Sequence, residues 1–226
     1  MNASLQARGR NAIAGPQPGL DLYRLFAACF SQPSPERFAW LSAREFRGLL
    51  RELARELRVE GAAPRTDHFP NYTAYEAAYI ALFEVGVPQP PVPLLESAHT
   101  SRAVPQEIVL ECVNFYDLLG LRPSGSAFPA DHLITQLEFL AAVRYLRERK
   151  SDPEEAAALD RLEADFLQRH LMSWLPAAIK KLSGINPPVF LRLLNLLCSL
   201  AKQQLALLAP PQTLARVSQK SSWTNS

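Results

Sequence analysis

Asn71 opens the stretch NYTAYEAAYIALFEVG, residues 71–86, whose pattern indicates the fold class. Its aromatic and leucine side chains recur at three- and four-residue spacing and so share one face of a helix: Tyr72, Tyr75, Tyr79, Leu82 and Phe83. An aromatic stripe of this kind is most often part of a core. Three tyrosines also suit a recognition surface, because a buried phenol needs a hydrogen-bond partner and Tyr is a preferred contact residue. Both interpretations stay open from the sequence.

Helical spacing continues through most of the chain and predicts an all-α fold. Apolar side chains recur at three- and four-residue intervals in about eight segments: residues 19–30, 35–59, 71–85, 105–119, 129–149, 152–171, 174–182 and 187–208. No alternation typical of strands competes with that spacing. We therefore expect one helical domain over residues 19–208, large enough to bury a sizeable core, with loose polar tails at 1–18 and 209–226.

A proline-rich loop follows the aromatic helix. Four prolines, which favour extended backbone and exclude a helix, lie in it: Pro88, Pro90, Pro91 and Pro93. The loop spans residues 86–102 and includes the step Glu96-Ser97. Because loops of this length are uncommon in compact domains and are usually functional, we expect it to contribute to a site.

A second motif, Pro129-Ala130-Asp131-His132, precedes the apolar helix that carries Glu138. Asp131 is the expected N-terminal cap of that helix. Asp131 and His132 could also act as an exposed acid–base pair, although no positioned nucleophile accompanies them. Glu138 lies about two turns further along, so Asp131 and Glu138 are predicted to form an acidic rail beside His132 that binds guanidinium groups.

Charge is distributed unevenly along the chain. Residues 69–140 contain eight acidic and two basic side chains, a net charge of −6, whereas the whole chain stands at +2. Because phosphate binding needs clustered Lys and Arg, this middle segment is a poor nucleic-acid surface. It suits a cationic peptide instead. Carboxylates that only solvate helix faces would give the same count.

Cysteines and histidines give no sign of a metal or redox site. Three cysteines, Cys29, Cys112 and Cys198, lie in apolar helical stretches and are expected to be buried thiols. There is no Cys-x-x-Cys pair, and no two of the four histidines are four residues apart. No glycine-rich cofactor loop is present either. We expect His170 to be a packed or capping residue, Trp174 to be a core anchor, and the chain to contain neither metal nor cofactor.

The sequence also bears on the compartment. No apolar run reaches the roughly 18 residues of a membrane span. The first residues carry Arg8 and Arg10 without an apolar stretch behind them, so a secretory signal is not expected. We therefore expect the protein to stay in the cytoplasm.

In these motifs the chain resembles the TorD/DmsD-type chaperones that mature molybdenum-containing redox enzymes. Four motifs occur in the family's order within residues 19–208: Tyr79-Ile80-Ala81-Leu82-Phe83, Pro90-Pro91 leading to Glu96-Ser97, Pro129-Ala130-Asp131-His132, and His170-Leu171-Met172-Ser173-Trp174. The chain departs from the family in the loop. Val92 stands where the family usually has an aromatic residue, and three extra residues follow it: Pro93, Leu94 and Leu95.

The resemblance implies a non-enzymatic, all-helical chaperone. It would bind the twin-arginine leader of a molybdoenzyme subunit, assist folding and insertion of the molybdenum cofactor, and proofread export. Six side chains match family positions implicated in leader binding: Tyr79, Leu82, Phe83, Pro129, Asp131 and His132. We add Glu96, at the end of the loop, and Glu138, from the acidic rail, as candidate peptide contacts. The resemblance is compatible with a monomer or a domain-swapped dimer and leaves the client and any bound guanine nucleotide or cofactor precursor open.

Two other functions stay open from the sequence. The protein could be a helical adaptor for a different partner, in which the motifs serve only as core. It could also be a small enzyme that uses Asp131 and His132.

Overall fold

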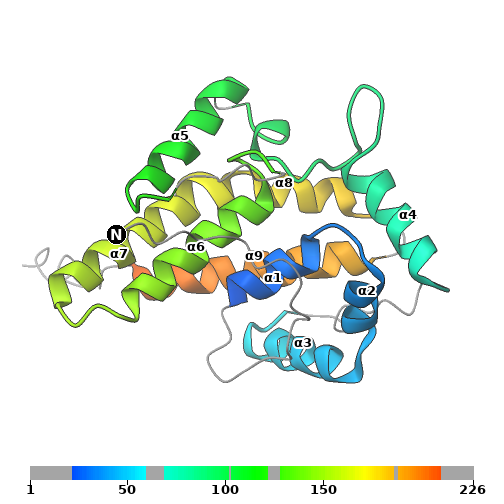
Figure 1. The fold of residues 1–226 in the computed structure, drawn as a ribbon, viewed down its shortest axis with the longest axis horizontal. Helices are drawn as coiled ribbons and strands as arrows, with labels where there is room; N and C mark the ends of the chain where they lie inside the picture. Colours follow the sequence, from blue (N-terminus) through cyan, green and yellow to red (C-terminus); the bar gives the residue numbers. More distant parts are fainter. Residues whose placement is uncertain (1–21, 60–68, 102, 122–127, 186–187, 210–226) are drawn as a thin grey trace, which may run out of the picture.

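The computed structural model describes residues 22–59, 69–101, 103–121, 128–185 and 188–209. The tail expected at 1–18 and nearly all of the tail expected at 209–226 lie outside these ranges. The described residues are helical apart from loops and one isolated bridge between Leu95 and His132 (Figure 1). The all-α fold expected from the sequence is confirmed.

The described residues form nine α-helices and two short helical turns. In chain order these are α1 Leu22–Phe30, α2 Pro35–Ser42, α3 Arg44–Glu56, α4 Tyr72–Phe83, the 3-10 turn η1 Glu96–Ala98, α5 Pro105–Asp117, α6 Leu133–Arg147, α7 Pro153–Phe166, the π-helical turn η2 Leu167–Leu171, α8 Met172–Leu182 and α9 Val189–Leu208. The segments expected as separate helices at 152–171 and 174–182 form one continuous rod, because α7, η2 and α8 follow one another without a break. With this rod the described chain makes about eight helical rods, the number expected from the spacing.

The core lies between α1, α6, the α7–α8 rod and α9. Helix α1 packs on α6 and α9, α6 packs on α7, and α8 packs on α9 (Figure 1). Fully buried side chains from these helices meet there, among them Phe26, Leu137, Trp174 and Leu197. Burying a large apolar side chain contributes roughly 1.5–3 kcal/mol, so this centre supplies much of the folding free energy.

Two helices begin at residues whose side chains cap the first turn. The Asn71 side chain accepts a 3.0 Å hydrogen bond from the Ala74 amide at the start of α4. Asp152 accepts one of 3.1 Å from the Glu154 amide at the start of α7. These side chains satisfy amides that have no partner within the helix, which fixes where each helix starts.

One predicted helix, residues 35–59, is two helices in the structure. Ala43 adopts an extended conformation, with φ −64° and ψ 146°, and separates α2 from α3. No Gly or Pro marks the break in the sequence. The turn brings the rings of Trp40 and Phe46 to a centroid distance of 4.3 Å. Tertiary packing therefore places this break, against the local helix propensity.

The aromatic face of α4 belongs to the core. Tyr75 and Tyr79 are 0% and 1% exposed, and Phe83 packs edge-on against Phe190 of α9 with ring centroids 5.0 Å apart. The Tyr79 hydroxyl donates a 2.7 Å hydrogen bond to the Phe30 carbonyl at the end of α1. The core interpretation of the tyrosine stripe is therefore right, and an open recognition face at Tyr79 and Phe83 is not present.

None of the helices in the described ranges has both the length and the apolar character that crossing a membrane requires.

Candidate functional site

The proline-rich loop and the Pro-x-Asp-His motif meet in the fold. The Leu133 amide donates a 2.9 Å hydrogen bond to the Leu94 carbonyl, and the Glu96 amide donates one of 3.1 Å to the Asp131 carbonyl. The Asp131 carboxylate accepts a 3.1 Å hydrogen bond from the Ser97 amide. Asp131 therefore caps the η1 turn of the loop, and the prediction that it caps the following helix is wrong.

His132 takes the capping role at α6. Its Nδ1 accepts a 3.2 Å hydrogen bond from the Ile134 amide, and its ring stacks on Phe128 at 4.4 Å. Burial lowers the pKa of His132 to about 4, so the ring is neutral at pH 7. Asp131 and His132 are 1% and 9% exposed, which contradicts the expected exposed acid–base pair. Both side chains bind backbone amides and are not arranged for proton transfer.

The acidic rail predicted from Asp131 and Glu138 does not form. Glu138 is exposed on α6 and shares a shallow hollow with Arg24 and Arg37. Burial raises the pKa of its carboxyl, and Arg24 acts in the opposite direction. A seven-residue spacing places two side chains on one face only when both lie in the helix. Asp131 precedes the first residue of α6, so its carboxylate turns to η1 instead.

A buried polar network lies beneath the loop. Glu96, 0% exposed, accepts a 2.7 Å hydrogen bond from Gln136 Nε2, and His170 Nδ1 lies 3.0 Å from the same carboxylate. Ser173 Oγ donates to the other oxygen at 3.3 Å. Gln136 Oε1 accepts a 3.1 Å hydrogen bond from Trp174 Nε1. The network therefore fastens η1 to α6, η2 and α8.

This network affects the stability of the fold strongly because its polar groups are buried. A carboxylate taken out of water costs several kcal/mol unless donors replace its hydration. Here polar groups of the protein surround Glu96, so losing one of them would leave a buried carboxyl oxygen without a partner. Glu96 is consequently a fastening residue of the loop and is not exposed as a peptide contact.

The π-helical turn η2 contributes His170 to this network. Pro176, in the first turns of α8, has no N–H for the Met172 carbonyl, so the regular helical ladder is interrupted next to η2. His170 is fully buried there, as expected of a packed residue. Sequence reasoning missed Gln136, although a lone amide inside the apolar run of α6 was a usable sign.

Glu96, Cys112 and His170 are close enough to be considered as a metal or catalytic group. Their ligand atoms lie within 4.8 Å of one another, and Cys112 Sγ is 3.4 Å from His170 Nδ1. The sulfur and the carboxylate face the same ring nitrogen, whereas a nucleophile–histidine–acid triad uses both nitrogens. Burial raises the pKa of the Cys112 thiol to about 12, which disfavours a thiolate nucleophile at this position. The hydrogen bonds account for the arrangement.

The loop is anchored at its base and exposed at its tip. Val92 and Leu94 are buried, and the Val92 amide donates a 2.9 Å hydrogen bond to the Leu82 carbonyl. Val87 at the tip is 100% exposed. Gly86 is needed for the tight return of the chain, since a Cβ there would stand 2.3 Å from the Gln89 carbonyl oxygen.

The structure thus distributes the eight predicted contact residues unequally. Six are buried and hold the scaffold together: Tyr79, Leu82, Phe83, Glu96, Asp131 and His132. Pro129 and Glu138 are exposed. The Pro129 carbonyl accepts a 2.9 Å hydrogen bond from Thr135 Oγ1, so its backbone also serves the start of α6.

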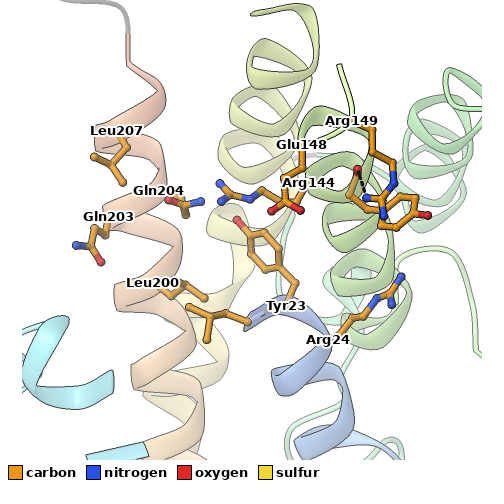
Figure 2. A pocket seen from close by; sticks show the side chains of 11 residues that line it. Tyr23, Arg24, Arg144, Glu148, Arg149, Leu200, Gln203, Gln204 and Leu207 are labelled. Atoms are coloured by element: carbon orange, nitrogen blue, oxygen red, sulfur yellow. Dashed lines mark hydrogen bonds between the residues drawn. The ribbon is translucent and has the colours of Figure 1, made fainter. Parts of the chain in front are cut away.

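A cavity of about 530 Å³ lies elsewhere, between α1, α6 and α9. Figure 2 shows Tyr23, Arg144 and Gln204 directed toward its centre. The Tyr23 hydroxyl donates a 2.8 Å hydrogen bond to the buried Glu163 carboxylate, and Arg144 lies 3.8 Å from it. Three arginines line this cavity, so it is a poor receptacle for a cationic peptide: Arg24, Arg144 and Arg149.

Comparison with known proteins places this scaffold in a family. Residues 41–180 match the family model described as nitrate reductase delta subunit. The chain is 30% identical over 122 residues to the perchlorate reductase assembly chaperone protein of Dechloromonas aromatica (strain RCB), covering 52% of this chain and 53% of the relative. It is 36% identical over 115 residues to the selenate reductase assembly chaperone protein of Thauera selenatis, and this match covers 49% of this chain and 58% of the relative.

A third curated relative is the chlorate reductase assembly chaperone protein of Ideonella dechloratans, 35% identical over 105 residues, with coverage of 45% and 53%. The chain spans about half the length of the curated relatives it matches. A crystal structure of a proposed redox enzyme maturation protein from Archaeoglobus fulgidus aligns with 88% of this chain and 99% of its own, at 19% identity and a TM-score of 0.46.

The family match covers more than half of the chain, and all three curated relatives are named as assembly chaperones of reductases. The chain therefore belongs to the nitrate reductase delta subunit family, and its resemblance to TorD-type maturation chaperones is confirmed.

Proposed function

We propose that the protein is a cytoplasmic chaperone for the assembly of a molybdenum-containing reductase. It binds the twin-arginine leader of the apo catalytic subunit, retains that subunit through folding and cofactor insertion, and then releases it for export. The observation that supports this most is the family match together with three relatives that are named as reductase assembly chaperones. The motifs that carry the resemblance also meet in one buried network, with Glu96 bound to Gln136 and His170 while Asp131 caps η1.

The buried motif residues serve this function indirectly. Asp131 accepts a hydrogen bond from the Ser97 amide of the loop, and Glu96 accepts one from Gln136 of α6. His132 caps the start of α6, so these residues together fix where the loop leaves the bundle. The outward surface around the fixed loop is what a partner can contact. A loop that is already held in one conformation loses less conformational entropy when a partner binds. Buried hydrogen bonds that hold the loop therefore favour binding.

The proposal involves no chemical step in this chain. Asp131 and His132, the two residues on which an enzymatic function would depend, are occupied in capping. The client is proposed to be a reductase of the class served by the perchlorate, selenate and chlorate reductase assembly chaperones. The molybdenum chemistry then belongs to that client alone.

Binding of synthetic leader peptides tests the proposal. The leaders of the source organism's own molybdenum reductases are labelled with a fluorophore and titrated with the full chain, beside copies in which both arginines are lysine. We expect one Arg-Arg leader to bind at least about tenfold more tightly than its Lys-Lys copy, a difference of about 1.4 kcal/mol, because guanidinium groups bind carboxylates through two parallel hydrogen bonds. Equal affinity for both copies, or no binding of any leader, would favour the adaptor function instead.

A further inference from the structure

Helix α5 has an outer face that the bundle does not cover. It lies at the edge of the molecule and packs on η1 (Figure 1). Its inward side chains are buried: Ile108, Cys112, Phe115 and Tyr116. Five side chains on the opposite side, which fall within about 100° of one another around the helix, are exposed: Glu107, Leu110, Asn114, Asp117 and Leu118.

Large apolar side chains are exposed on this side of α5 and at both of its caps. Leu110 is 59% exposed, and Leu118, at the C-terminal cap, is 69% exposed. Val104, at the N-terminal cap, is 54% exposed. Seven large apolar or aromatic side chains are exposed in the described part of the chain, and these are three of them. They are spread over a stripe roughly 20 Å long, since each residue of a helix advances about 1.5 Å.

The same segment carries negative charge without any positive side chain of its own. Residues 104–121 contain Glu107, Glu111 and Asp117 and neither Lys nor Arg. Glu107 reaches back toward the Val104 amide, at 3.4 Å, and Glu111 pairs with Arg169 of η2 at one edge of the face. Asp117 stands at the C-terminal end, where the helix macrodipole adds a partial negative charge.

We propose that the outer face of α5, from Val104 to Leu118, is the surface on which the twin-arginine leader docks. The leader's arginines meet Asp117 and the negative end of the helix, with their aliphatic stems on Leu118. The apolar stretch of the leader then runs along Leu110 toward Val104. This inference rests on the proposed function and names the surface that performs it.

The chemistry of the occupant favours the leader over a second copy of the chain. A twin-arginine leader joins adjacent positive charges to an apolar stretch within one short segment. The α5 face offers a partner for both parts on a single helix, with the Asp117 carboxylate at its C-terminal end and the exposed side chains of Leu110 and Val104 toward its N-terminal end. A charge-complementary surface also steers a cationic segment during encounter, so binding should weaken as salt rises.

The test compares two double variants of the full chain. Leu110→Ser with Asp117→Lys alters the α5 face, and Leu207→Ser with Glu52→Lys makes the same types of change at exposed positions on α9 and α3. All four side chains are exposed, so circular dichroism and the melting temperature should stay close to those of the wild type. We expect the α5 variant to lose about tenfold in affinity for the Arg-Arg leader and most of its preference over the Lys-Lys copy, while the control variant changes less than about twofold.

The outcomes separate this inference from the proposed function. If the wild type binds the leader and the α5 variant binds it equally well, the α5 surface is wrong and the leader-binding function stands. If the wild type binds no leader, the proposed function fails and this inference falls with it. Sedimentation velocity adds a further check, because a wild-type dimer that the α5 variant converts to a monomer, with leader binding intact, would identify the face as a self-interface and overturn the proposal.

Discussion

Gln136 Nε2 donates a 2.7 Å hydrogen bond to the carboxylate of Glu96, forty residues earlier in the chain. Both side chains are 0% exposed, and the carbonyl oxygen of the same Gln136 amide accepts a hydrogen bond from Trp174. One amide therefore connects the end of the proline-rich loop, helix α6 and helix α8. This contact is one of several that fix the position of the loop relative to the bundle.

Glu96→Gln should destabilise the fold. The glutamine amide would place N–H groups opposite the donors that now bind the Glu96 carboxylate. Each buried donor left without an acceptor costs about 1–3 kcal/mol of stability. Urea unfolding measures the loss. Glu52→Gln, at an exposed position on α3, is the control and should change the unfolding free energy by less than about 0.5 kcal/mol. An unchanged midpoint for Glu96→Gln would show that the network is not holding the loop.

Two substitutions at Tyr79 separate the stability contributed by packing of its ring from that contributed by the hydrogen bond of its hydroxyl. Tyr79→Phe removes only the 2.7 Å hydrogen bond to the Phe30 carbonyl and should cost about 1 kcal/mol. Tyr79→Ala empties a core position and should cost roughly 3–5 kcal/mol. Thermal and urea unfolding provide both values. A small loss of stability in Tyr79→Ala, accompanied by a loss of leader binding, would restore the open recognition face.

His132 should make stability depend on pH in mildly acidic solution. Its pKa is lowered by burial from 6.5 to about 4, so between these values the unfolded chain binds a proton that the folded chain does not. The free energy of unfolding is therefore unaffected by protonation of His132 above pH 6.5. It falls by up to about 3 kcal/mol as the pH drops from 6.5 toward 4.

Unfolding free energies of the wild type and of His132→Asn, measured from pH 7.5 to 4, test this. Asn keeps a side-chain acceptor for the cap of α6 and does not titrate. The wild type should lose more stability than the variant across this window. Parallel curves would mean that His132 has the same pKa in the folded and the unfolded chain, which contradicts the lowered pKa.

Replacing two of the glycines by alanine should change the free energy of unfolding in opposite directions. Gly86→Ala would place a Cβ 2.3 Å from the Gln89 carbonyl oxygen, which is backbone and cannot step aside, so we expect a loss of about 1–3 kcal/mol. Gly48→Ala, inside α3 with nothing within 4 Å of the new Cβ, should gain about 0.5–1 kcal/mol. Equal effects at the two positions would contradict the tight return at residue 86.

The helices could be predicted because their signals are local. The apolar spacing of α1, α6 and α9 involves only neighbouring residues, and the structure confirms these helices. The break at Ala43 could not be predicted, because neither Gly nor Pro marks it in the sequence.

The site was harder to predict because its contacts are long-range. Asp131 has the residue type and position of a helix cap, and only the fold shows that the loop, rather than α6, receives its carboxylate. Glu96 and His170 are 74 residues apart, and no spacing rule relates them. The exposed side of α5 could be derived from its pattern, but its place at the edge of the bundle could not.

The molybdenum content of the client reductase tests the proposed assembly role most directly. The reductase is purified from cells that lack this chain and from cells that have it restored, and its molybdenum is measured by mass spectrometry. The proposal predicts that the reductase is largely apo or degraded without the chain and contains about one molybdenum per catalytic subunit when the chain is present. A fully loaded reductase from cells that lack the chain would contradict it.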